Sequence, residues 1–169
     1  MAAMRENISQ HGAQAAANFG AVMTGVAIAE GNEKAAEWMA TQLDSLPEDA
    51  RKEALLSFHE QKPDIETVKL HENTVVAIAA KLPRESDRVE FVAGHFTRAN
   101  SGYETNVAIL RSLGSASEQE KVLVQVMPGF RNYGDGWQRD AFERYAKELN
   151  LSDDARGRLA AEAERLLAK

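Results

Sequence analysis

The sequence contains no cysteine among its 169 residues. This absence excludes disulfide bonds, zinc sites with thiolate ligands, iron–sulfur clusters and a cysteine nucleophile. Long hydrophobic runs are also missing. The most apolar segment, residues 13–29, carries Gln14, Asn18 and Thr24 and is too polar to make a membrane-spanning helix. We therefore predict that the chain has no membrane span.

The N-terminal segment has only weak features of a signal peptide. Ala27-Ile28-Ala29 resembles a small-residue cleavage site, and Arg5 would supply the preceding positive charge. Against this reading, Glu6 adjoins Arg5 and the apolar run is interrupted, so we interpret the segment as an Ala-rich buried helix. We predict a cytoplasmic protein, with a periplasmic or secreted location as the alternative if residues 1–29 act as or replace a signal peptide.

Positive charge is in short supply. The chain has 20 Lys and Arg against 26 Asp and Glu, a formal net charge of -6. The field of the whole molecule therefore repels nucleic acids and anionic membranes, and we predict no nucleic-acid partner. The length fits one domain, and the hydrophobic content of 44% is enough to form a core.

A turn with the chemistry of a helix start recurs along the chain. Its common pattern is Leu, a cap-like residue, acids, Ala and Arg, clearest in residues 45–51 and 150–156 and looser in residues 82–88. Ser followed three residues later by Glu, as in Ser45/Glu48 and Ser115/Glu118, is typical of a helix N-terminus. The turns predict helix boundaries near residues 44–48, 82–86, 113–117 and 149–153.

Helical periodicity fills the segments between these turns, and no long segment alternates with the period of two expected for a strand. The run 122–126 is strand-like in composition, but Pro128 ends it and we expect a short buried helix. The apolar positions on one face predict eight core residues: Leu55, Phe58, Val76, Phe91, Phe96, Ile109, Leu110 and Phe142.

Together these signals predict an all-α fold. We expect a right-handed array of about four helical hairpins, either an α-solenoid or a compact helical bundle, preceded by an extra N-terminal helix. The whole chain, 1–169, would form one helical-repeat domain. Its predicted parts are an N-terminal helix at about 1–31 and hairpins at 32–64, 65–99, 100–134 and 135–169.

The pattern resembles α-helical hairpin repeats of the tetratricopeptide-like and HEAT-like classes. Residues 32–38, NEKAAEW, followed by Ser45-Leu46-Pro47 and Ala50-Arg51, are similar to short bacterial repeats in which an Ala-Ala-x-Trp helix precedes Leu-Pro and Arg. The chain lacks the Trp-Leu-Gly-Tyr signature of tetratricopeptide repeats. The resemblance therefore implies an architecture and no functional residue.

The four histidines, His11, His59, His71 and His95, show no recognised metal-ligand spacing such as H-E-x-x-H. We expect them on the surface or half-buried, and we predict neither a metal ion nor any other cofactor.

Paired acids at Glu48/Asp49 and Asp153/Asp154 would serve acid–base chemistry, but they sit where a helix N-terminus favours negative charge. The chain also has no G-x-S-x-G elbow and no phosphate-binding loop. We predict no catalytic residue, and we favour a protein that is not an enzyme.

The most distinctive segment spans residues 128–139, where three aromatic and two arginine side chains lie close together. Such residues are enriched in binding hot spots. A weaker copy at 94–103 indicates the alternative, that the aromatics pack between repeats. The predicted binding residues are Arg98, Tyr103, Phe130, Arg131, Tyr133, Trp137 and Arg139.

The function favoured by the sequence is a non-enzymatic scaffold or adaptor that binds a protein partner. This expectation depends on the repeat architecture and on the lack of a catalytic constellation. One alternative is a small-ligand-binding protein or enzyme with a pocket near Arg131 and Trp137. Another is a helical subunit of a larger assembly, including a homo-oligomer, joined through the small residues of helix 13–29.

Overall fold

The computed structural model of the chain describes residues 18–60, 68–98, 102–129 and 137–167. All regular secondary structure in these residues is helical, so the prediction of an all-α fold is confirmed. The elements are α3 (Phe19–Glu30), α4 (Asn32–Leu43), α5 (Glu48–Ser57), the short 3-10 helix η1 (Phe58–Glu60), α6 (Val68–Lys81), α7 (Glu85–Arg98), α8 (Tyr103–Arg111), α9 (Ala116–Val126), α10 (Trp137–Glu148) and α11 (Asp153–Leu167).

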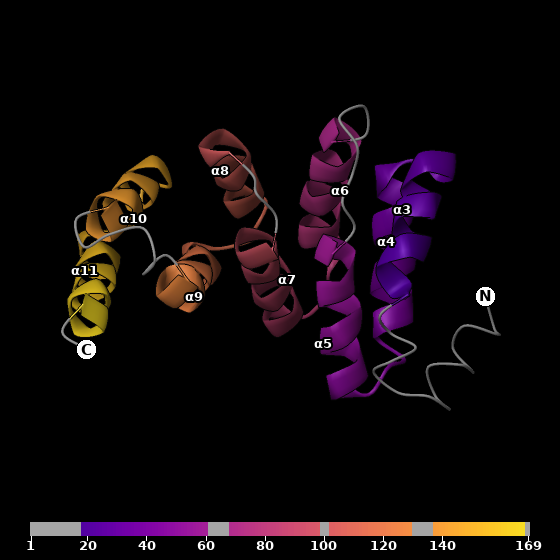
Figure 1. The fold of residues 1–169 in the computed structure, drawn as a ribbon, viewed down its shortest axis with the longest axis horizontal. Coiled ribbons are helices and arrows are strands. Elements are labelled where there is room, and N and C mark those ends of the chain that lie inside the picture. Colours follow the sequence, from indigo (N-terminus) through magenta and orange to yellow (C-terminus); the bar gives the residue numbers. More distant parts are fainter. Residues whose placement is uncertain (1–17, 61–67, 99–101, 130–136, 168–169) are drawn as a thin grey trace.

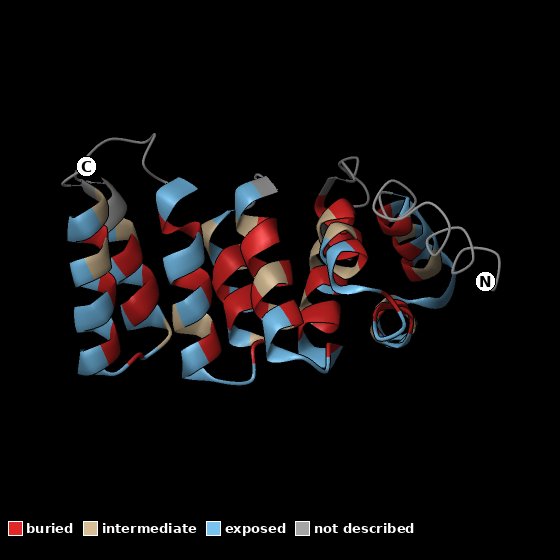
Figure 2. Ribbon diagram, turned by 90° about the horizontal axis from the view of Figure 1, so that it is seen from below, coloured by how far each residue is buried: buried red, intermediate tan, exposed pale blue. Residues whose placement is uncertain are grey.

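The helices after α3 alternate between two layers of an elongated array (Figure 1). The first layer contains α4, α6, α8 and α10, and the second contains α5, α7, α9 and α11. Helix α3 packs against α4, α5 and α6 at one end. Buried and exposed residues alternate along most of the helices, as expected for helices with one face in a core (Figure 2).

The four predicted helix boundaries are confirmed. The turns between the paired helices are residues 44–47, 82–84, 112–115 and 149–152. Each turn places one leucine in the core: Leu46, Leu82, Leu113 and Leu151. The recurring leucine therefore packs an apolar side chain into the core at the same end of each helix pair.

The arginine of the turn motif satisfies backbone carbonyls. Arg51 donates from Nε to the carbonyl oxygen of Leu43 at 3.2 Å and from Nη2 to that of Leu46 at 2.9 Å. Arg88 donates from Nη1 to the carbonyl oxygen of Leu82 at 2.7 Å. The last carbonyls of a helix have no partner within the helix, so an arginine at this position stabilises the turn.

The capping prediction is right for one serine and wrong for the other. Ser115 is the N-cap of α9: its hydroxyl accepts from the N–H of Glu118 at 3.2 Å, and the Glu118 carboxylate accepts from the N–H of Gly114 at 3.0 Å. The N-cap of α5 is Pro47 instead of Ser45. Ser45 lies two residues too early, and its hydroxyl donates to a carbonyl of the preceding helix.

Six of the eight predicted core residues are buried: Leu55, Phe58, Phe91, Ile109, Leu110 and Phe142. Val76 and Phe96 are only partly buried and pack against the edge of the core. On α6 the inward position belongs to the neighbouring Val75, which is fully buried. Phe96 lies near the end of α7, where its ring contacts Tyr145 at 5.8 Å between centroids.

The strand-like run 122–126 forms the second half of α9, as expected. Val122, Leu123 and Val126 point into the core, whereas Val124 is exposed. None of the helices in the described ranges is long and apolar enough to cross a lipid bilayer.

Candidate functional site

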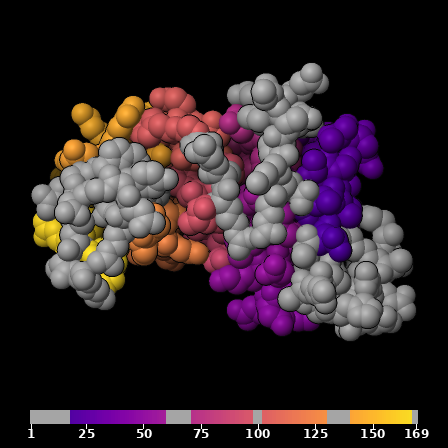
Figure 3. Space-filling model, in the orientation of Figure 1, coloured from indigo at the N-terminus to yellow at the C-terminus, as the bar shows by residue number. Residues whose placement is uncertain are grey.

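A polar groove of about 580 Å³ lies between α5 and α7 in the second layer. In the view of Figure 3, α5 lies low in the molecule, to the right of its middle. The groove has four carboxylate and two cationic side chains. Its lining consists of Glu48, Asp49, Arg51, Lys52, Leu55, Ser86, Asp87 and Glu90.

The two cations of the groove each face one carboxylate across it. Lys52 Nζ is 3.1 Å from an oxygen of Glu90, and Arg51 Nη1 is 4.0 Å from an oxygen of Asp87. Burial raises the pKa of Asp87, and the positive charge of Arg51 opposes this rise. The remaining two carboxylates of the lining lie in the first turn of α5, so the excess negative charge is concentrated there.

The acidic excess continues along the whole second layer. In each of α5, α7, α9 and α11 the acidic residues outnumber the lysines and arginines by one, whereas over the first layer the two kinds balance. Ion pairs join successive helices of the second layer: Lys52–Glu90, Arg88–Glu118, Lys121–Glu85 and Arg158–Glu120. Ion pairs therefore run along the second layer, whose helices carry a small net negative charge.

A second groove, of about 460 Å³, lies between α10 and α11. Its floor is apolar and includes Phe142, Ala146 and Leu159, and its rim includes the charged Asp153 and Arg156. The groove would accept an apolar side chain but brings together no set of catalytic groups of recognised geometry.

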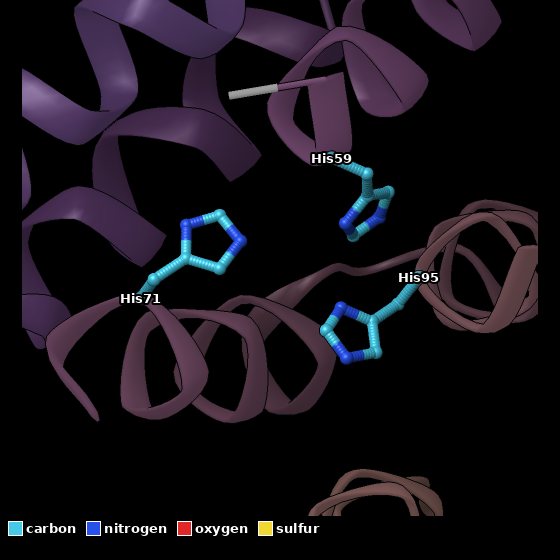
Figure 4. A group of neighbouring side chains, drawn as sticks. All are labelled: His59, His71 and His95. Carbon is cyan, nitrogen blue, oxygen red and sulfur yellow. The ribbon is translucent and has the colours of Figure 1, made fainter. Parts of the chain in front are cut away.

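Three histidines meet inside the array, and the sequence spacing did not indicate this. His59 comes from η1, His71 from α6 and His95 from α7, and their rings surround a common space (Figure 4). Each offers one ring nitrogen, and these three nitrogens lie within 4.8 Å of one another. The prediction that these histidines are at the surface or half-buried is wrong, because all three are buried.

The environment of each ring sets its protonation. His59 Nε2 lies 2.7 Å from the carbonyl oxygen of Phe91, so Nε2 carries the proton and Nδ1 carries the lone pair. The His71 ring stacks on Phe58, with centroids 4.6 Å apart and planes within 4°. Burial lowers the pKa of His71, and it lowers the pKa of His95 to about 4, so both rings are neutral at physiological pH.

His95 is the most enclosed of the three, at 1% exposure. Neither of its ring nitrogens has a hydrogen-bond partner among the residues that the structure describes. A buried polar group is normally paired, so this ring marks a place where a further binding partner would be accommodated.

Gly94 allows η1 to approach α7 closely. A Cβ atom at this position would lie 2.6 Å from Leu56 Cδ2 and 3.1 Å from His59 Cδ2. The absence of a side chain at Gly94 therefore helps to set the position of the His59 ring.

No short sequence motif relates the histidines of the cluster. His59 follows Phe58 and His95 precedes Phe96, and these two phenylalanines recur at the ends of successive second-layer helices. The two histidines are therefore offset relative to these phenylalanines, and the packing of η1 against α7 is what brings their rings within contact distance. Their centroids are 5.4 Å apart.

Of the predicted binding residues, only Tyr103 has a described side chain. The Arg144 guanidinium lies 3.8 Å above its ring, and the Tyr103 hydroxyl donates to the Arg144 carbonyl oxygen at 3.4 Å. Its ring also lies 4.8 Å from that of Tyr145, between centroids. These contacts join α8 to α10 and favour the alternative that Tyr103 packs between helix pairs.

The other predicted binding residues fall outside the described side chains. Phe130, Arg131 and Tyr133 belong to the segment 130–136, which lies outside the described residues. Arg98 lies in α7, and Trp137 and Arg139 lie in α10, but their side chains are outside the described part of the structure. The predicted ligand pocket near Arg131 and Trp137 lies in this part of the chain as well.

Comparison of the chain with protein-family models, with curated proteins and with solved structures finds no match.

Proposed function

We propose that the chain is a helical-repeat scaffold that binds a protein partner along its second layer. The observation that carries this proposal is the polar groove between α5 and α7, which is lined by four carboxylates and only two cations. A groove with this balance accepts a lysine- or arginine-bearing segment of a partner. Complementary charge of this kind gives an interface its specificity and its association rate.

The architecture supports the same proposal. Arrays in which each helix pair contacts its neighbours offer extended surfaces, and their function is usually recognition. The two first-turn carboxylates of the groove, Glu48 and Asp49, are exposed and available to a partner. The apolar stem of a partner lysine or arginine would lie over the floor of the groove, where Leu55 is located.

Charge-neutralising variants test this proposal. The double variant Glu48→Gln/Asp49→Asn removes the excess charge of the groove and keeps the side-chain shapes. Its matched control is Glu104→Gln/Asp140→Asn, which neutralises one exposed first-turn acid on α8 and one on α10, both in the first layer. We expect the parent and the control to capture the same partner and the groove variant to lose it.

Salt and cross-linking sharpen the test. Capture should weaken strongly when the salt concentration rises to about 0.5 M, since the Debye length then falls to roughly 4 Å. A photo-cross-linking residue at Ser86, in the groove, should label the partner, whereas one at the exposed Ala108 of the first layer should not. If the groove variant and the control capture the partner equally well, the proposal that the partner binds this groove is wrong.

A specific observation favours a second candidate, a subunit that associates through α3. Two large apolar side chains of α3 are exposed, Val22 at 37% and Ile28 at 60%. Exposed apolar surface of this kind is typical of an interface. If the parent chain forms an oligomer and Ile28→Asp lowers the mass measured by light scattering, association through α3 is supported. A parent chain with the mass of a monomer would exclude it.

A further inference from the structure

The cluster of His59, His71 and His95 combines three properties of a metal centre. Its three ligand nitrogens lie within 4.8 Å of one another, and they come from three different helical elements (Figure 4). All three rings are buried, so few water molecules compete for their lone pairs. The group thus offers converging lone pairs in a sheltered space.

The surroundings of the rings match those of bound imidazoles. A histidine that binds a metal usually donates its other ring N–H to a carbonyl or carboxylate oxygen, and His59 Nε2 makes such a contact with the Phe91 carbonyl. His95 supplies a ring whose nitrogens have no hydrogen-bond partner among the described residues. Stacking on Phe58 sets the orientation of the His71 ring.

We propose that His59, His71 and His95 bind one divalent transition-metal ion, with Zn²⁺ as the ion that fits best. Neutral imidazole suits Zn²⁺, Cu²⁺ and Ni²⁺, whereas Ca²⁺ and Mg²⁺ require oxygen ligands. No carboxylate belongs to the ligand group found among the described residues. Three histidines leave a fourth position of a tetrahedral zinc ion for water or an anion.

The geometry requires only a small movement of the rings. Zinc binds imidazole nitrogen at about 2.0–2.1 Å, so two such ligands at the tetrahedral angle lie roughly 3.4 Å apart. The nitrogens of the cluster are already within 4.8 Å of one another. Modest rotations of the three side chains bring them to bonding distance. The ion would connect η1, next to α5, with α6 and α7, and so join two successive helix pairs.

The test measures metal binding by the full chain. Protein stripped with a chelator is dialysed against Zn²⁺ or Co²⁺, and the bound metal is measured by elemental analysis. We expect one ion per chain, and visible absorption bands of tetrahedral Co²⁺. Saturating Zn²⁺, at about 100 times the dissociation constant, should raise the melting temperature by roughly 5–10 °C.

Variants assign the ligands. Because even outer-shell changes cost roughly 10–100-fold in metal affinity, His71→Gln and His95→Gln should each weaken binding by at least about 100-fold. Thr74→Val is the matched control, since Thr74 is buried on the same helix as His71 and donates to Asn32 at 2.8 Å. This control should bind the metal as the parent does, even where it lowers stability.

Circular dichroism shows which variants fold, and His71→Gln serves as the test if His95→Gln does not fold. A folded parent chain that binds no stoichiometric Zn²⁺ or Co²⁺ would overturn the proposal. Folded His71 and His95 variants with the affinity of the parent would overturn it as well. The proposal is independent of the partner groove, so these measurements leave that groove untested. It replaces the prediction, drawn from the sequence, that no metal binds.

Discussion

Arg88 on α7 and Glu118 on α9 form a two-point ion pair that is shielded from solvent. Arg88 donates from Nε to one carboxylate oxygen of Glu118 at 3.3 Å and from Nη2 to the other. The Glu118 side chain is 4% exposed and also accepts from the N–H of Gly114. One carboxylate thus completes the N-terminal cap of α9 and ties two successive second-layer helices together.

The first prediction concerns pH. The hydrogen bond from Arg88 is the main cause that lowers the pKa of Glu118, and it outweighs the opposite effect of burial. Below the ordinary glutamate pKa the unfolded chain therefore binds more protons than the folded chain. The stability that Glu118 contributes is present above that value and is lost as the pH falls through the lowered pKa.

The variant Glu118→Gln isolates this effect. At about pH 7 we expect it to lower the free energy of unfolding by about 1.5–3 kcal/mol, the usual value for a hydrogen bond to a charged group. The difference between parent and variant, measured by urea denaturation, should shrink as the pH falls to about pH 3. Glu104→Gln is the control, because Glu104 is exposed, and it should change stability by less than about 0.5 kcal/mol. A constant difference at all pH values would contradict the assignment.

The second prediction compares two glycines on α3. A Cβ atom at Gly20 would lie 2.3 Å from the carbonyl oxygen of Ser57, and the N–H of Gly20 donates to the Ser57 hydroxyl at 3.0 Å. Gly20→Ala should therefore force α3 away from the junction of α5 and η1 and destabilise the fold by at least about 1–3 kcal/mol. Gly25→Ala meets nothing within 4 Å and should stabilise α3 by about 0.5–1 kcal/mol. Thermal denaturation of both variants decides the comparison, and equal effects would show that α3 packs differently.

The third prediction separates two phenylalanines on α7. Phe91 is fully buried, and emptying its site with Phe91→Ala should cost about 3–5 kcal/mol. Phe96 is only partly buried, so Phe96→Ala should cost less, about 1–3 kcal/mol. The sequence alone places both phenylalanines in the core and so predicts the full cost of about 3–5 kcal/mol for Phe96→Ala as well. A denaturant midpoint that falls further for Phe96→Ala than for Phe91→Ala would contradict the structure.

The fourth prediction concerns the segment 128–139, in which the sequence predicts Arg131 and Trp137 as partner-binding residues. If the segment binds, Arg131→Ala and Tyr133→Ala should leave the melting temperature nearly unchanged and weaken binding by at least about 2 kcal/mol. If it packs between helix pairs, Trp137→Ala should destabilise the fold and Arg131→Ala should change neither property. If the Arg131→Ala variant captures the partner as strongly as the parent chain does, Arg131 does not bind the partner.

Much of the fold could be predicted because its information is local. The turn motif places a leucine and an arginine at fixed offsets, and both have a structural reason: Leu46 enters the core and Arg51 donates to helix-end carbonyls. Patterns of this kind survive in a single sequence, because each one depends on a few neighbouring residues. The helix boundaries follow from them.

The details that sequence reasoning missed depend on contacts between distant residues. Val75 and Val76 are equally apolar, and only the packing of α6 decides that Val75 faces the core. The histidine cluster arises because three elements bring together rings that no short motif relates. A search for ligand spacings within one helix cannot find such a group.

The sequential packing of the two layers also has a mechanical consequence. In the second layer, α5 contacts α7, α7 contacts α9, and α9 contacts α11. When the chain is pulled by its two ends, the helix pairs would therefore unfold one after another. Force applied along the array should peel off the terminal pairs in successive steps, each with a similar gain in length, instead of rupturing the whole fold in one event.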